Sequence, residues 1–116
     1  MVESSPVTAE DAKLVTLARG ARARVDAAEG AAVRDETGRT YSAATVGLTS
    51  LALSALQLAV AQAIAAGARG IEAAAVVTAA ASVPPTDLAV LREAGGTDVP
   101  VLLAGLRGDV TGRHRT

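Results

Sequence analysis

Apolar and polar residues follow two spacings along this chain, and their order predicts a mixed α/β fold. In three segments a capping residue or a proline is followed by apolar residues at helical spacing. These segments predict helices over 8–24, 49–66 and 86–94. Four short apolar runs bounded by turn residues predict strands over 30–34, 39–46, 72–78 and 99–104. The first two strands are joined by Asp35-Glu36-Thr37-Gly38, which is typical of a hairpin loop.

This order predicts an αβα sandwich of the α/β class, with a mixed sheet of four to five strands and a buried central helix. We expect one domain over 8–104, a disordered N-terminus over 1–7 and a flexible tail over 105–116, with at most one further short strand. The helix over 49–66 is apolar around most of its circumference, which predicts cover on several sides. A homo-oligomer is therefore expected.

The composition of the chain excludes several classes of function. Half of the residues are apolar, alanine is the commonest, Phe, Trp and Cys are absent, and Tyr41 is the single aromatic residue. The absence of cysteine excludes disulfides, thiolate catalysis and zinc sites built on sulfur. A net charge of −1 without aromatic stacking residues argues against nucleic acid as a partner.

The longest stretch without a charged residue, 40–68, could be interpreted as a membrane span. Gln57 and Gln62 interrupt its most apolar part, and no aromatic belt closes its C-terminal end, so a buried soluble helix is expected instead. The first residues lack a basic segment followed by an apolar run, and we expect no signal peptide. These features predict a cytoplasmic protein without a membrane partner.

The ordered landmarks of the chain resemble the small cytidine deaminases from about Leu14 to Ala104. They are an Arg- and Ala-rich first helix, Gly30-Ala31-Ala32 at the first strand, the hairpin from Asp35 to Tyr41, the helix from Leu51 to Ala66, the strand residues Ala75-Val76-Val77, and Val90-Leu91-Arg92-Glu93 with Val99-Pro100-Val101-Leu102-Leu103. The resemblance implies the deaminase fold over most of the chain. It also implies that the expected homo-oligomer is a homotetramer, with a homodimer as the fallback.

The resemblance also implies a zinc centre whose residues this sequence lacks. Such deaminases hold zinc through a Cys/His-x-Glu and a later Pro-Cys-x-x-Cys, and the glutamate shuttles protons. The first motif falls on Ser54-Ala55-Leu56, so Ser54 stands at a ligand position and Leu56 at the proton shuttle. The two thiolate positions become Pro84 and Asp87. We therefore expect no metal, no cofactor and no catalytic residue at these four degenerate positions.

The substrate side departs from the family in the same way. In the family an Asn-x-Glu binds the ribose, and its aligned positions here are Ala43-Ala44-Thr45. A phenylalanine that packs against the pyrimidine in the family aligns near Ala27-Ala28.

The polar residues near these positions have structural interpretations. Asp87 is interpreted as a helix-dipole partner, Ser54 as a small packing residue, and His114 as a solvated residue of the tail.

The sequence thus predicts a catalytically degenerate deaminase-like protein that acts in binding or assembly, with itself or an unidentified protein as partner. Two alternatives stay open: an active nucleoside deaminase whose site is misaligned, and a sensor that binds a nucleoside without converting it. If the site is degenerate, we expect the space below the central helix to be dry and partly filled by Leu53, Leu56 and Val76.

Overall fold

The structure is a computed structural model that describes residues 6–116, so most of the segment predicted to be disordered, 1–7, lies outside the described residues. Its helices are α1 (Ala9–Val25), α2 (Ala55–Ala65) and α3 (Pro85–Gly95). Its strands are β1 (Gly30–Asp35), β2 (Thr40–Ala44), β3 (Val46–Gly47), β4 (Ala52–Leu53), β5 (Ile71–Val77), β6 (Pro100–Ala104) and β7 (Val110–Arg115). The α/β class expected from the sequence is confirmed.

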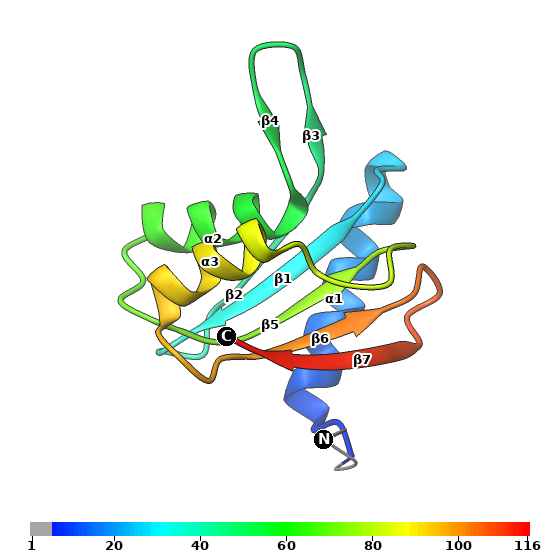
Figure 1. Cartoon of the computed structure of the whole chain (residues 1–116). Helices are drawn as coiled ribbons and strands as arrows, with labels where there is room; N and C mark the ends of the chain where they lie inside the picture. The colour runs from blue at the N-terminus through cyan, green and yellow to red at the C-terminus, as the bar shows by residue number, and fades with distance from the viewer. Residues whose placement is uncertain (1–5) are drawn as a thin grey trace.

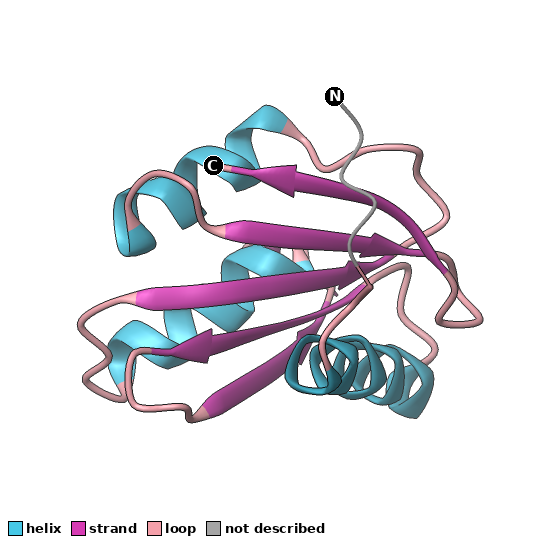
Figure 2. Ribbon diagram, turned by 90° about the horizontal axis from the view of Figure 1, so that it is seen from below, coloured by secondary structure: helices cyan, strands magenta, loops and turns pink. Residues whose placement is uncertain are grey.

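One five-stranded sheet, in the order β2-β1-β5-β6-β7, forms the middle layer. Only β5 and β6 are parallel, and the other neighbours are antiparallel. Helix α1 covers one face of this sheet, and α2 and α3 cover the other (Figures 1 and 2). The expected mixed sheet is therefore present, and β3 with β4 forms a separate two-stranded hairpin.

Successive side chains of a strand point to opposite faces of the sheet, so the core consists of two apolar clusters, one on each face. Val33, Val76 and Leu103 point toward α2 and α3, whereas their neighbours Ala32 and Leu102 pack on α1. Most residues of the central strands are buried, because helices cover both faces.

Small residues and a cap place α1 on the sheet. The Asp11 N–H donates to Thr8 Oγ1 at 3.1 Å, so Thr8 is the N-cap that the sequence predicts. Farther along the helix, Gly30 lies so close that a Cβ on it would come 2.0 Å from the Ala18 carbonyl oxygen. A glycine at the start of β1 is therefore what lets α1 approach the sheet.

The second helix begins later than the sequence predicts. The expectation of a helix over 49–66 is wrong at its start, because 46–53 forms the β3–β4 hairpin and α2 begins only at Ala55. Ser54 and Gln57 form a capping box, which fixes that start. Helix α2 buries one side and exposes the other, where Ile64 is 49% exposed, so the chain covers this helix on one side and not on several.

The predicted flexible tail is likewise corrected. Residues 110–115 form β7, which pairs antiparallel with β6 along its length and makes the outer edge of the sheet. His114, expected to be solvated, is half-buried and lies opposite Val101 in the register. Gly112 and the three consecutive residues Arg113, His114 and Arg115 hide this strand in the sequence, because they lack the apolar alternation that marks a strand.

Tight hydrogen bonding holds the β1–β2 turn together around the buried Asp35. Its Oδ1 accepts from the Thr37 hydroxyl at 2.7 Å and from the backbone amides of Thr37 and Arg39, and its Oδ2 accepts from the Tyr41 hydroxyl at 2.8 Å. These donors, the Thr37 hydroxyl first, lower the pKa of Asp35 from 3.8 to about 2. The sole aromatic residue of the chain thus stabilises this turn through its hydroxyl.

The lowered pKa predicts how this turn responds to acid. The folded state binds Asp35's proton less readily than the unfolded chain, so its stabilisation is complete above about pH 4 and is lost as pH falls toward 2. Asp35→Asn should therefore lower the free energy of unfolding at pH 6 by more than at pH 2.5. Urea unfolding of both proteins at the two pH values measures this; an equal difference at both would contradict the role given to Asp35.

Among residues 6–116, no helix combines the length and the apolarity that crossing a bilayer requires.

Candidate functional site

Two helix N-termini meet at one end of the sheet. In the register of β1, Gly30 lies between Ala44, the last residue of β2, and Val77, the last residue of β5. The chain leaves Ala44 toward α2 and Val77 toward α3, so both helices begin at this end, which we call the Gly30 end. Helices α2 and α3 pack against each other on the same face (Figure 1). The fold thus brings together the two segments that carry the implied zinc positions.

Ser54 and Leu56 lie at the start of α2 but serve different structural roles. The Ser54 Oγ accepts from the Gln57 N–H at 3.1 Å, and the Gln57 Oε1 accepts from the Ser54 N–H at 2.9 Å. Ser54 is therefore the helix cap, not the packing residue expected from the sequence. Leu56 is 1% exposed and belongs to the apolar cluster beneath α2.

Pro84 and Asp87 lie at the start of α3. Pro84 is exposed at the N-cap position and offers no side-chain hydrogen bond. Asp87, in the first turn, is 5% exposed, and a carboxylate there is stabilised by the positive end of the helix dipole, as the sequence predicts. Val83, just before them, shares one buried apolar cluster with Leu56 and Val76.

The space below α2 is apolar at this end. Leu56 and Val76, two of the three residues expected to fill it, are both buried in this cluster. Leu53, the third, is misplaced in the prediction: it lies in β4, only half-buried, because the hairpin carries it away from the helix.

A polar network that the sequence interpretation missed lies at the same end. Thr78 Oγ1 donates to Glu29 Oε2 at 2.7 Å and accepts from the Ala80 N–H at 3.0 Å. Thr45 Oγ1 accepts from the Glu29 N–H at 3.0 Å, and the Thr45 N–H donates to the Glu29 carbonyl. Glu29 therefore ties the start of β1 to the ends of β2 and β5. A threonine directly after each of two strands was the available sequence signal.

The three residues aligned with the family's ribose-binding Asn-x-Glu, Ala43-Ala44-Thr45, lie at the end of β2. Ala43 is buried in β2 and Ala44 is half-buried, and neither presents a polar side chain. Thr45 has its hydroxyl engaged with the Glu29 backbone. Of the residues aligned with the pyrimidine-packing phenylalanine, Ala28 is exposed and Ala27 half-buried.

A zinc ion of the deaminase type does not fit the residues at this end. Ser54 offers a hydroxyl already used in capping, Pro84 offers no donor atom, and Asp87 offers one carboxylate, whereas such a site needs three strong ligands such as thiolate or imidazole. Within residues 6–116, no three His, Cys, Asp or Glu side chains lie close enough together to hold a metal ion.

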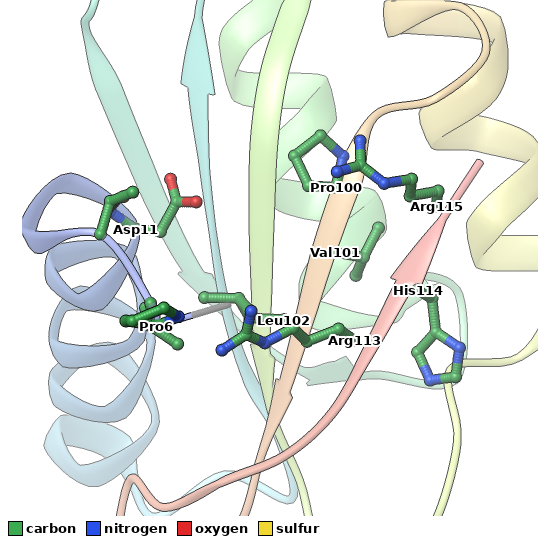
Figure 3. A pocket seen from close by; sticks show the side chains of 10 residues that line it. Pro6, Asp11, Pro100, Val101, Leu102, Arg113, His114 and Arg115 are labelled. Carbon is green, nitrogen blue, oxygen red and sulfur yellow. Dashed lines mark hydrogen bonds between the residues drawn. The ribbon is translucent and has the colours of Figure 1, made fainter. Parts of the chain in front are cut away.

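His114, the single histidine of the chain, lies away from the Gly30 end. His114 and Arg113 are near the end of β7, which pairs with the start of β6 and so lies at the opposite end of the sheet from Gly30. A cavity of about 240 Å³ there is lined by residues of α1, β6 and β7, Asp11 and Arg113 among them (Figure 3). Arg113 and His114 point to opposite sides of β7, as their alternation requires (Figure 3).

The fold and the site together define a class: a three-layer α/β sandwich whose candidate site lies where two helices begin at one end of a mixed sheet. The chain belongs to the cytidine deaminase-like family, whose profile matches residues 7–108. The family resemblance and the fold predicted from the sequence are thereby confirmed.

Solved structures of similar shape are cytidine deaminases. The enzyme from Burkholderia pseudomallei is 28% identical, with a TM-score of 0.73, and the match covers 90% of this chain and 89% of that one. The enzyme from Mycobacterium leprae is 19% identical, with a TM-score of 0.69 over 89% and 90% of the two chains. The enzyme from Mycobacterium tuberculosis is 24% identical, with a TM-score of 0.67 over 77% and 80%. No curated protein sequence matches the chain at a significant level.

Proposed function

We propose that this chain is a cytidine deaminase-like domain that has lost zinc-dependent deamination and acts as a binding or assembly module. The observation that carries the proposal is Leu56, an apolar side chain 1% exposed at the position that the resemblance assigns to the proton shuttle. Loss of the thiolate positions to Pro84 and Asp87 supports the same conclusion.

The chemistry explains why these changes together abolish deamination. Water free of metal has a pKa near 15.7, against about 7 for zinc-bound water in a favourable site, so hydroxide is scarce at neutral pH. Leu56 can neither accept a proton from that water nor deliver one to the ring nitrogen. General acid–base catalysis alone is typically worth about 10²–10⁴-fold, so its loss on top of the metal leaves no measurable rate.

We expect no zinc in the purified protein by elemental analysis, and no conversion of cytidine or deoxycytidine to the uracil nucleoside on long incubation. Growth medium supplemented with zinc and a zinc-loaded deaminase as positive control make both negative results meaningful. Stoichiometric zinc with turnover proportional to protein would overturn the proposal and favour the active-enzyme alternative.

Thermal melting with added nucleosides distinguishes an assembly module from a nucleoside sensor. A panel of nucleosides should leave its melting temperature unchanged, because the apolar cluster of Leu56, Val76 and Val83 fills the space below α2. A saturable rise in melting temperature with one nucleoside would instead support the sensor.

A further inference from the structure

A groove of about 250 Å³ lies between α1 and the loop that joins β6 to β7. Its apolar lining residues are Val7, Ala12, Val15 and Val110. Two arginines supply its charged lining, Arg19 from α1 and Arg107 from the loop. No carboxylate of residues 6–116 lines it, so the groove combines apolar walls with positive charge.

The apolar part of this groove is open to solvent on its β7 side. Helix α1 packs mainly on β1, β2 and β5, which leaves β7 beside the helix and not beneath it (Figure 2). Val110, the first residue of β7, is 39% exposed, whereas Val15 on α1 is buried. Val110 is therefore accessible to an apolar side chain of another molecule.

Arg19 and Arg107 carry charge that the domain does not neutralise. Both side chains are exposed, and neither forms an ion pair or a side-chain hydrogen bond with another residue in the described part of the chain. Gly108 brings the loop to the helix, since a Cβ on it would come 3.4 Å from the Arg19 Cδ. Asp109 does not line the groove, and its Oδ1 lies 2.8 Å from where a Cβ on Gly105 would be.

A third arginine, Arg22, lies one helical turn beyond Arg19, on the same side of α1. Its Nε is buried and donates to no acceptor among the residues that the structure describes. Buried donors normally have a partner, so this atom indicates an acceptor that the domain itself does not supply. Positive charge and an unused donor are thus placed along one side of α1.

A short acidic peptide complements this surface better than a free anion or a nucleic acid. The cavity drawn in Figure 3 shares Val7 with the groove, so the two form a track beside α1 that is longer than a small anion needs. No aromatic residue of the described chain lines either hollow, so bases would find nothing to stack on. Arginine pairs well with carboxylates, and valine walls accept aliphatic side chains.

We propose that the groove between α1 and the β6–β7 loop binds an extended acidic peptide of a partner protein. Carboxylates of the peptide pair with Arg19 and Arg107, and an aliphatic side chain packs against Val110. These contacts lie on the face of the sheet opposite to α2 and α3. This inference rests on the proposed function, because it names the kind of partner that the binding module takes.

Fluorescence anisotropy tests the proposal with a labelled probe peptide in which glutamate and valine alternate. The wild type should bind it saturably at about 0.15 M salt, where charges more than about 8 Å apart are largely screened. Arg19→Glu and Arg107→Glu should each weaken binding at least about 5-fold, because an attraction becomes a repulsion. Arg24→Glu is the matched control: it makes the same change on the side of α1 near β2 and should alter the affinity less than about two-fold.

Changes in the probe test the apolar contact and the class of ligand. A peptide of alternating glutamate and serine should bind at least about 5-fold more weakly, because it loses the apolar contact with Val110. A peptide of alternating lysine and valine should not bind. The proposal would be overturned by a wild type that binds no acidic peptide, by equal losses in Arg19→Glu and Arg24→Glu, or by a single-stranded DNA oligomer that binds the same arginines more tightly than the peptide.

The outcomes separate this groove from the loss of deamination. A protein without zinc or turnover that also fails to bind the peptide removes the groove as a partner site and leaves the proposed loss of chemistry standing. A zinc-containing, active protein whose peptide binding is weakened by Arg19→Glu has the opposite meaning.

Discussion

Leu56→Glu should lower the free energy of unfolding by about 3–5 kcal/mol, the largest effect expected of a single polar substitution in this chain. Leu56 is 1% exposed and surrounded by apolar residues such as Val76 and Val83. A carboxyl placed there gains neither a metal nor an ion pair and must be protonated or hydrated at the expense of packing. Urea unfolding at neutral pH measures the loss.

Two matched variants make this result specific to the site. Ala61→Glu adds the same side chain to the exposed side of the same helix and should change stability by less than about 0.5 kcal/mol. Leu56→Met keeps the volume and apolarity and should cost less than about 1.5 kcal/mol. If Leu56→Glu unfolded like the wild type, position 56 would have to reach solvent or a cation, and the proposed loss of the proton shuttle would lose its basis.

Gly30→Ala should be the second most damaging change, although it adds one methyl group. The new Cβ would lie 2.0 Å from the Ala18 carbonyl oxygen and 2.9 Å from the Arg22 Cβ, so α1 would have to move away from β1. Because the obstacle is backbone and not a flexible side chain, we expect a loss of about 2–4 kcal/mol.

The same substitution on the helix itself should have the opposite sign. Gly20 lies within α1 and is exposed, and a Cβ added to it would meet no atom within 4 Å. Gly20→Ala should therefore stabilise the protein by about 0.5–1 kcal/mol through helix propensity. A thermal melt of the two variants, side by side, checks both signs; a neutral Gly30→Ala would show that α1 does not approach β1 so closely.

Several elements could be predicted because their signals are local. Thr8 with two acids marks the start of α1, Asp35 to Gly38 marks the β1–β2 turn, and the apolar run before Thr78 marks the strand buried on both faces. The four candidate site positions were assigned from the order that the family resemblance implies, and the structure places them at the starts of α2 and α3: Ser54, Leu56, Pro84 and Asp87.

Other features depended on contacts between distant segments. The β3–β4 hairpin replaces the predicted first turns of α2, and the capping box of Ser54 and Gln57 was the overlooked local signal. The Glu29–Thr78 bond joins residues far apart in sequence, so no spacing predicts it. The same holds for the groove between α1 and the β6–β7 loop, which no single element contains.

The sequence by itself determined the α/β class, most of the elements and the absence of thiolate ligands, because periodicity, capping and composition are properties of the chain alone. Only the tertiary structure decided that β7 closes the sheet, that Leu56 lies in a packed apolar cluster, and that arginines of α1 and of the β6–β7 loop line one groove. Strand pairing and burial are set by whichever surfaces meet when the chain folds, and residues from separate elements supply those surfaces.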